Sequence, residues 1–375
     1  MRLAESATTH DQFEVAQWIQ LVLTRGVGSE TGRRLLARFG LPQHIFSASS
    51  SALAEVAGSK IARSLLTPPP SDIAACIART LLWLKQPDHH LLTLADTDYP
   101  PQLLNIPDPP LLLYAKGKRA LLRQAGIAVV GSRNASAQGR INAEKFADSL
   151  SANGLTVISG MALGIDAAAH TGALPHPAST IAVIGTGIDI VYPARNHALA
   201  HHIADKGCLL SEYALGTPAI ASNFPRRNRL ISGLSRAVLV IEAAAQSGSL
   251  ITARMAAEQG RDVFAIPGSI HSPLAKGCHQ LIRQGAKLVE STQDILDELG
   301  LAAHTEPRAV KRAETPQLSE GAAELLNTLG FDPVDMDTLS ARSGLTAAAL
   351  SVQLLALELH GLLEMLPGGQ VRRMG

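Results

Sequence analysis

With 375 residues, the chain is long enough for two or three domains. Its composition, 46% hydrophobic and 17% charged, is that of a folded globular protein and excludes a disordered chain. The first ten residues contain no apolar segment, and no run of about 18 apolar residues occurs later, so we expect neither a signal peptide nor a membrane span. Three widely spaced cysteines favour a reducing cytoplasm over a disulfide framework or a zinc site.

Opposite charges balance over the whole chain but not along it. The 33 Lys and Arg against 32 Asp and Glu give a net charge of +1. No acid lies between Asp108 and Glu144, where six Lys and Arg fall, or between Glu212 and Glu242, where four Arg fall. Residues 287–337 reverse this pattern, with eleven acids against four Lys and Arg. Either the middle of the chain forms a basic site, followed by an acidic region, or these runs arise by chance.

The N-terminal third predicts helices. A Gly-Val-Gly hairpin precedes a helix that we expect to begin near Ser29 or Thr31. The prolines at 68–70 end one helix, and another is expected to begin at Ser71. Residues 96–114 are rich in proline and predict an extended connector into the next domain.

Residues 126–300 alternate apolar runs with Ala-rich helical stretches. The runs are short, rich in β-branched residues and nearly free of polar ones, which is typical of parallel strands buried on both faces. They lie at 127–130, 155–158, 180–184, 237–241 and 262–266, with helices expected between them, among others at 163–173 and 249–260. This alternation predicts an α/β fold with a Rossmann-like doubly wound sheet.

The end of the chain predicts a linker and a winged helix. Residues 301–317 show neither the helical nor the strand periodicity of apolar residues. Residues 318–375 predict two helices, a turn at Gly344, a third helix from about Thr346 and two short strands. The third helix carries no Lys or Arg, and 318–375 hold seven acids against three arginines. Because duplex binding draws on neutralising phosphates, we expect this domain to dock a protein.

Glycine or serine follows each of three predicted strands. Small residues let a ligand approach the backbone at the carboxyl edge of an open α/β sheet. The turn at 129–139 adds Arg133 and a helix N-terminus, which favour phosphate. It has neither the Walker A lysine nor the dinucleotide spacing, so we expect no ATP, NAD or other cofactor. Either the small residues serve helix–strand packing or the turns form a phosphate site. We predict the phosphate site, at Gly131, Ser132, Arg133, Ser159, Gly160, Gly185, Thr186 and Gly187.

Residues 223–236, NFPRRNRLISGLSR, hold four arginines and one aromatic residue. They lead towards the same edge of the sheet. Arg226, Arg227 and Arg229 cannot all lie on one side of a helix, so we expect some to be structural. Arginine for phosphate and Phe224 for base stacking would bind a single strand of nucleic acid without sequence preference. The alternative is that Phe224 belongs to the core and the arginines form internal salt bridges.

Candidate catalytic residues are few. Asp166 and His170 stand four residues apart on a predicted helix and would suit an acid–base or metal-binding pair. The alternative, which we favour, is structural: Asp166 at the helix N-terminus and His170 near its middle. Glu242 ends a strand near the site, without an identifiable partner. We predict neither catalytic residues nor a bound metal ion.

Long motifs between 91 and 300 resemble the DNA-processing protein A family, DprA or Smf. They include VVGSRNASAQG (129–139), VISGMALGIDAAAHTGAL (157–174), IAVIGTGIDIVYPARN (181–196) and NFPRRNRLISGLSRAVLVIEAAAQSGSLITARMAAEQGRDVFAIPGSI (223–270). The segment ALELHGLLEMLPGGQVRR (356–373) resembles the family's winged helix, and GVGSETGRRLLARFGLPQHIF (26–46) is more loosely similar to its helical SAM-like domain. The resemblance implies a helical domain at 1–90, a Rossmann-like domain at 91–300, a linker at 301–317 and a winged helix at 318–375.

The resemblance also implies a function. Members of this family are cytoplasmic, non-enzymatic homodimers that bind incoming single-stranded DNA during natural transformation and protect it. They help load RecA onto the strand and displace or accommodate single-strand binding protein. By this similarity, Arg133 would grip phosphate, and dimer and RecA contacts would lie towards 255–285. The predicted groove residues are Phe224, Arg226, Arg227, Asn228, Gly248 and Ser249. The stretch TPAIASN (217–223) lacks a lysine that some relatives place in the groove, so Arg226 and Arg227 are expected to matter more.

Two other functions stay open. Enzymes of the lysine-decarboxylase-like (LOG) group share the Rossmann-type fold and cleave nucleoside monophosphates through a PGGxGTxxE turn. The counterpart EAAAQSGSLITA (242–253) has the glycine but lacks the following glutamate, which disfavours this function. A transcription factor would bind duplex DNA through residues 318–375, whose charge disfavours it.

Overall fold

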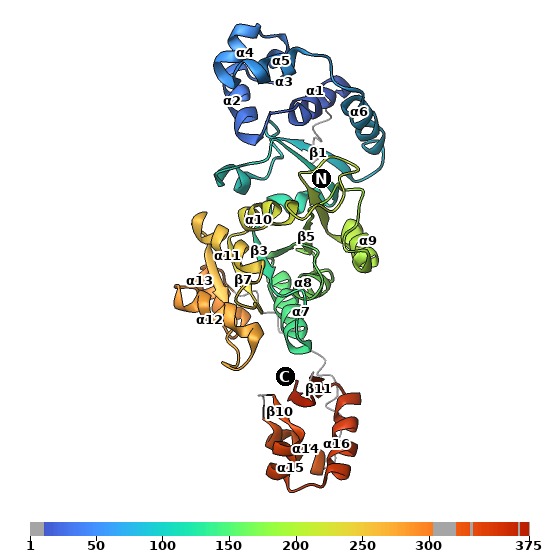
Figure 1. Cartoon of the computed structure of the whole chain (residues 1–375), viewed down its shortest axis with the longest axis vertical. Helices are drawn as coiled ribbons and strands as arrows, with labels where there is room; N and C mark the ends of the chain where they lie inside the picture. Colours follow the sequence, from blue (N-terminus) through green and yellow to red (C-terminus); the bar gives the residue numbers. More distant parts are fainter. Residues whose placement is uncertain (1–10, 303–319, 331–332, 367, 375) are drawn as a thin grey trace.

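The structure is a computed structural model that describes residues 11–302, 320–330, 333–366 and 368–374. Figure 1 shows the N-terminal helices, a central sheet domain and a C-terminal winged helix following one another along the long axis. Most of the predicted linker, 303–317, lies outside the described residues. Among the helices of the described ranges, none combines the length and apolar character needed to cross a membrane.

A nine-stranded sheet forms the central domain, in the order β1-β2-β6-β5-β4-β3-β7-β8-β9. The strands from β6 to β9 in this order are parallel, whereas β2 pairs antiparallel with both β1 and β6. The strands are β1 (His89–Thr93), β2 (Leu112–Gly117), β3 (Gly126–Val130), β4 (Thr156–Ser159), β5 (Thr180–Val183), β6 (Cys208–Ser211), β7 (Ala237–Val240), β8 (Asp262–Ala265) and β9 (Lys287–Leu288). Every residue of β3, β4, β5 and β7 is buried. The predicted Rossmann-like sheet is confirmed.

Helices cover both faces of this sheet. Apolar side chains of α7, α8 and α13 pack on one face, and those of α10, α11 and α12 pack on the other. The helices are α7 (Ala137–Ala152), α8 (Ile165–Ala173), α9 (His197–Lys206), α10 (Asn223–Leu234), α11 (Ser249–Glu258), α12 (Lys276–Arg283) and α13 (Thr292–Glu298). Burial on both faces explains why the strands read as continuous apolar runs.

The chain reverses its direction across the sheet between β3 and β7. From β3 it moves outward through β4, β5 and β6, then returns to place β7 on the other side of β3 and continues to β8 and β9. Val130 and Val240 are partners in register at the ends of these two central strands. The connections that follow β3 and β7 therefore lead away in opposite directions, which opens a crevice at the carboxyl edge.

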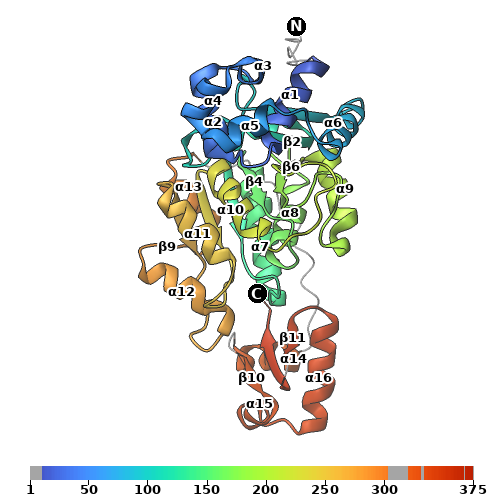
Figure 2. The same ribbon diagram turned by 45° about the horizontal axis from the view of Figure 1, so that its top comes forward.

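The N-terminal helices form two groups, which Figure 2 shows above the sheet. Their bounds are α1 (Gln12–Leu23), α2 (Ser29–Phe39), α3 (Pro42–Ser47), α4 (Ser50–Ala57), α5 (Ser59–Leu66) and α6 (Ser71–Trp83). Helices α2 to α5 surround a small core of their own, which includes Leu35 and Ile45. Helices α1 and α6 pack on the sheet instead, where Trp18 shares a core with Tyr114 of β2. The helical part is thus anchored on the edge of the sheet.

Residues 96–114 differ from the extended connector that their prolines predicted. They contain a 3-10 turn, Pro101–Asn105, and run into β2. Leu103 and Ile106 are buried in the core with α10. Gly233 of α10 gives them room, because a Cβ there would lie 2.7 Å from Ile106. Proline prevents a regular helix here, but it permits a tight turn that apolar neighbours bury.

The C-terminal domain has the predicted winged-helix order with one additional strand. Its elements are α14 (Glu320–Leu329), β10 (Val334–Asp335), α15 (Met336–Ser343), α16 (Ala347–Leu359), β11 (Leu363–Leu366) and β12 (Gln370–Arg373). Gly344 ends α15 in the left-handed conformation, and Thr346 caps α16. On α16, Val352 and Leu359 are 70% and 79% exposed. An apolar helix face does not suit a DNA backbone, and protein docking by this domain stays a prediction.

Candidate nucleic-acid interface

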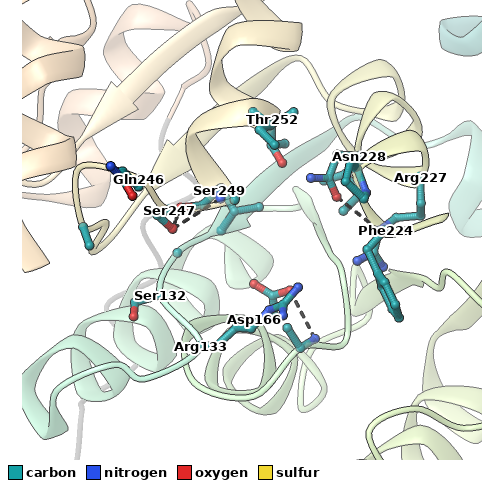
Figure 3. Close-up of a pocket in the computed structure, with 18 of the residues that line it drawn as sticks. Ser132, Arg133, Asp166, Phe224, Arg227, Asn228, Gln246, Ser247, Ser249 and Thr252 are labelled. Atoms are coloured by element: carbon teal, nitrogen blue, oxygen red, sulfur yellow. Dashed lines mark hydrogen bonds between the residues drawn. The ribbon is translucent and has the colours of Figure 1, made fainter. Parts of the chain in front are cut away.

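A pocket of about 430 Å³ opens at the crevice between β3 and β7. It is lined by the turn after β3, the N-terminal half of α10 and the loop that leads from β7 into α11. Figure 3 shows side chains from these segments around the space, with Phe224 and Arg227 on one side and Gln246 to Ser249 opposite. The predicted residues that line it are Gly131, Ser132, Arg133, Phe224, Arg227, Asn228, Gly248 and Ser249.

Arg133 is the exposed cation of this pocket. The turn that carries it is held in place: the Ser132 amide donates to the carbonyl of Glu242 at 2.8 Å, and the Asn134 amide donates to the Ser132 hydroxyl. Gly131 is required, since a Cβ there would lie 2.6 Å from Ile165. Within the described part of the chain, the Arg133 side chain makes no hydrogen bond or ion pair. A fixed backbone thus presents a guanidinium that is available to an anion.

Arg227 lies beneath the pocket and supports it. Its guanidinium is buried and donates to two carbonyls. One belongs to Gly160, which follows β4 and lies at 2.6 Å, and the other belongs to Val183, the last residue of β5. Burial lowers the pKa of Arg227 to about 10, and the nearby Asp166 carboxylate opposes this shift. Asp166 in turn accepts the amides of Gly160 and Ala162. Burial raises the pKa of Asp166, and Arg227 opposes that shift as well. These contacts join the ends of two strands.

His170 does not form an acid–base pair with Asp166. Its Nδ1 lies 2.7 Å from the Thr180 hydroxyl, and its ring is fully buried. Burial, followed by the charge of Arg227, lowers the pKa of His170 to about 3, so the ring is neutral at physiological pH. The structural interpretation of this pair is confirmed. Among the described residues, no cluster of three or more His, Cys, Asp or Glu side chains is arranged to hold a metal ion.

Phe224 is paired with a second aromatic residue that sequence reasoning missed. Tyr192, from the connection between β5 and α9, is 51% exposed, and its ring centroid lies 5.5 Å from that of Phe224. Phe224 itself packs on Gly185, where a Cβ would lie 2.9 Å from the ring. The only sequence signal for Tyr192 was its place shortly after a glycine turn at the carboxyl edge. The structure thus provides two rings where the sequence offered one.

Two of the arginines on α10 face away from the pocket. Arg229 is buried and donates to Glu212 at 2.5 Å, with Asp108 at 3.4 Å. Arg226 is exposed, lies 3.7 Å from Glu212 and reaches towards Ser29 of α2. The expectation that some of these arginines are structural is confirmed. Glu212 is the last acid before the acid-free run in the sequence, and the fold brings it back against the arginines of that run.

The N-terminus of α7 is occupied, which corrects the expectation that it faces a phosphate. The carboxylate of Glu242 accepts the amide and the hydroxyl of Ser136, at 3.0 and 2.5 Å. The carboxylate of Glu364, from the winged helix, accepts the amide of Ala137 at 3.2 Å. A carboxylate satisfies helix N-terminal amides as a phosphate would. The phosphate-binding capacity of this turn therefore rests on Arg133.

Five further predicted residues lie beside the pocket rather than in its lining. The Ser159 hydroxyl donates to the carbonyl of Val129, and the Thr186 hydroxyl donates to that of Ile190, each at 2.7 Å. These groups hold the backbone turns that follow β4 and β5. Direct contact between this set and a ligand stays a prediction; the set comprises Ser159, Gly160, Gly185, Thr186 and Gly187.

Comparison with known proteins gives consistent results. The family model described as DNA recombination-mediator protein A matches residues 90–300, and the DprA winged helix domain model matches 309–369. The chain is 44% identical to Protein Smf of Escherichia coli over 301 residues, which cover 79% of this chain and 80% of that protein. It is 45% identical to DNA processing protein DprA of Streptococcus pneumoniae over 253 residues, or 64% of this chain and 89% of that protein.

Solved structures agree with these relatives. The X-ray structure of DprA from Streptococcus pneumoniae aligns with a TM-score of 0.66 at 38% identity, covering 77% of this chain and 98% of that one. The Helicobacter pylori DprA structure, described as revealing a unique single-stranded DNA binding mode, gives a TM-score of 0.52 at 31% identity over 56% of this chain and 95% of that one. The chain therefore belongs to the DNA recombination-mediator protein A family, known as DprA or Smf.

Proposed function

We propose that this protein binds single-stranded DNA at the pocket between β3, α10 and α11. The observation that carries the proposal is one available arginine, Arg133, in a pocket rimmed by the ring of Phe224, with Tyr192 beside it. Arginine binds backbone phosphates, while aromatic rings stack on bases of any sequence. The Helicobacter pylori relative, described as binding single-stranded DNA, supports the same ligand class.

The aromatic pair favours a single strand over a duplex. Bases in a duplex are stacked on one another, so a protein ring can reach a base face only where the strand is unpaired. The third helix of the winged helix carries no Lys or Arg, which disfavours this domain as a duplex-binding site. The ligand of the pocket is then a nucleotide of an open strand.

Membership of this family is the basis for proposing a more specific activity. We propose that the protein acts as a cytoplasmic homodimer that protects the bound strand, helps load RecA onto it and displaces or accommodates single-strand binding protein. The region expected to make the dimer and RecA contacts, 255–285, overlaps a groove of about 510 Å³ along α11 and α12, and this supports a docking role. Its polar lining includes Arg254, Arg261 and Gln280.

Nucleoside monophosphate hydrolysis is the competing function. It needs a carboxylate that is available at the pocket, as in the LOG group. Asp166 lines the pocket, but it accepts two backbone amides, and the Glu242 carboxylate is engaged by Ser136. These contacts favour binding over hydrolysis.

The test is a titration of the full chain with a fluorescent dT oligonucleotide and with a duplex of the same length. We expect tighter binding of the single strand. Incubation with the four nucleoside monophosphates, followed by chromatography for free base, runs in parallel. Base release, or equal affinity for both DNA forms, would contradict the proposal. A RecA filament assembly assay on strands coated with single-strand binding protein tests the proposed RecA loading. We expect faster assembly when the protein is present.

A further inference from the structure

The wing of the C-terminal domain contacts the sheet domain through a half-buried carboxylate. Glu364 of β11 and Arg372 of β12 are cross-strand partners and form an ion pair, with side chains only 17% and 14% exposed. The other oxygen of Glu364 accepts the amide of Ala137, the first residue of α7, at 3.2 Å. Figures 1 and 2 both show the winged helix beyond the end of α7. The acidic domain thus has a partner within its own chain.

This contact adjoins the proposed DNA pocket. Ala137 follows, by four residues, the turn that carries Arg133. Glu242 connects the two places, since its carbonyl accepts the Ser132 amide and its carboxylate accepts the Ser136 amide. A third cavity, of about 320 Å³, lies between the wing and the sheet domain, and both Glu242 and Arg372 line it. The DNA pocket, lined by residues 131–134, and the docked wing, which contacts Ala137, therefore lie on adjacent parts of one segment.

The Ala137 amide can donate to the Glu364 carboxylate or to a phosphate, but not to both. Arg372 balances the charge of Glu364, whereas the Glu242 carboxylate on the same turn has Ser136 as its partner. A strand bound at Arg133 brings one further negative charge with each nucleotide. Glu242 is fixed within the sheet domain, whereas Glu364 belongs to the winged helix, which has an apolar core of its own and can therefore move as a unit. A phosphate satisfies the vacated amide as well as a carboxylate does.

We propose that the winged helix is an intramolecular competitor of the DNA strand, with Glu364 on the first turn of α7 as the competing anion. This inference rests on the proposed function of the pocket. Strand binding releases the wing, and a docked wing weakens strand binding by the same factor, because coupling between two sites is reciprocal. Release also frees the wing surface for a partner at the moment when DNA is bound.

The test compares the full chain with Glu364→Gln and with Glu358→Gln as a matched control. Both substitutions remove one negative charge from the winged helix, but Glu358 is exposed on α16, and its side chain makes no hydrogen bond or ion pair with the described residues. We expect Glu364→Gln to bind a dT oligonucleotide about fivefold more tightly or better, at the lower end of typical coupling. Glu358→Gln is expected to remain close to wild type. Equal affinity of the two variants, or weaker binding by Glu364→Gln, overturns the inference while wild-type binding keeps the proposed function intact.

A second measurement needs no variant. Hydrogen exchange of the wild-type chain, with and without dT oligonucleotide, follows the amides of 131–137 and those of β11 and β12. We expect slower exchange in the turn before Ala137 and faster exchange in the wing when DNA binds. Unchanged or slower exchange in the wing overturns the inference, since a static interdomain contact predicts that result. Absence of DNA binding by every form overturns both proposals.

Discussion

The rings of Tyr192 and Phe224 lie 5.5 Å apart between centroids and are inclined by 42°, although the two residues come from different connections of the sheet. Phe224 stands on α10, and Tyr192 stands in the loop between β5 and α9. They meet because both connections begin at the carboxyl edge. With Arg133 across the pocket, the pair forms the surface proposed to bind a DNA strand.

Removal of either ring is expected to weaken strand binding without changing its salt dependence. Tyr192→Ala and Phe224→Ala should each reduce the binding free energy for a dT oligonucleotide by about 1–3 kcal/mol, the usual contribution of one stacked base. The slope of affinity against salt should stay at the wild-type value, because no charge is removed. Anisotropy titrations at several salt concentrations measure both quantities. Tyr192→Phe keeps the ring and should bind normally; wild-type affinity of Tyr192→Ala would refute a stacking role.

Gly185→Ala should act through Phe224. The added Cβ would lie 2.9 Å from the ring, so the ring must move although every contact atom is retained. We expect weaker binding of the dT oligonucleotide, and no further loss when the substitution is made in a Phe224→Ala chain. Gly28→Ala, where a Cβ meets nothing within 4 Å, is the control. Independent, additive losses in the double variant would mean that Gly185 acts by another route.

Arg227 is expected to contribute chiefly to stability. Arg227→Met removes the donor to the carbonyls of Gly160 and Val183 and leaves Asp166 buried without its opposing charge. A hydrogen bond from a charged group contributes about 1.5–3 kcal/mol, so we expect the loss of both bonds to lower the free energy of unfolding by about 3 kcal/mol or more. Arg226→Met, one residue away and exposed, should stay within about 0.5 kcal/mol of wild type. Denaturant unfolding curves give both values, and similar midpoints for the two variants would contradict this assignment.

His170 should make the protein sensitive to acid. The ring is neutral in the folded chain, with a pKa lowered to about 3, whereas the unfolded chain has the ordinary value of 6.5. Between these values the unfolded state binds more protons, so the stability that is present above pH 6.5 is lost as pH falls towards 3. The loss from this one group is at most about 1.4 kcal/mol per pH unit. His170→Asn should flatten the dependence of unfolding free energy on pH, and exposed His360→Asn should not. Identical slopes for the two variants would exclude His170 as the source.

Local sequence pattern was sufficient to predict the sheet and the position of Arg133 at its carboxyl edge. The strand β3 is a continuous apolar run because it is buried on both faces, and the glycine after it marks the place where a ligand approaches the backbone. Both signals are carried by neighbouring residues. The same reasoning failed for 96–114, because proline limits backbone angles but does not report which side chains the fold will bury.

Contacts between distant segments could not be predicted from one sequence. Glu212 neutralises Arg229 across 17 positions, and Glu364 reaches Ala137 across 227. Contacts across such separations in sequence produce no periodic pattern of residues that could reveal them. The acid-free run around α10 therefore suggested more unpaired positive charge than the folded protein has. Likewise, the N-terminus of α7, where we expected a phosphate, is occupied by the carboxylates of Glu242 and Glu364.

The most direct test of the central claim is the salt dependence of single-strand binding by wild type, Arg133→Ala and the control Arg342→Ala, an exposed arginine of the winged helix. Each phosphate neutralised on a single strand contributes about −0.7 to the slope of log affinity against log salt. We predict that Arg133→Ala weakens binding and makes the slope shallower by about that amount, while Arg342→Ala leaves both unchanged. A slope that Arg133→Ala does not alter would show that no phosphate is bound at the turn after β3, and would contradict strand binding at this pocket.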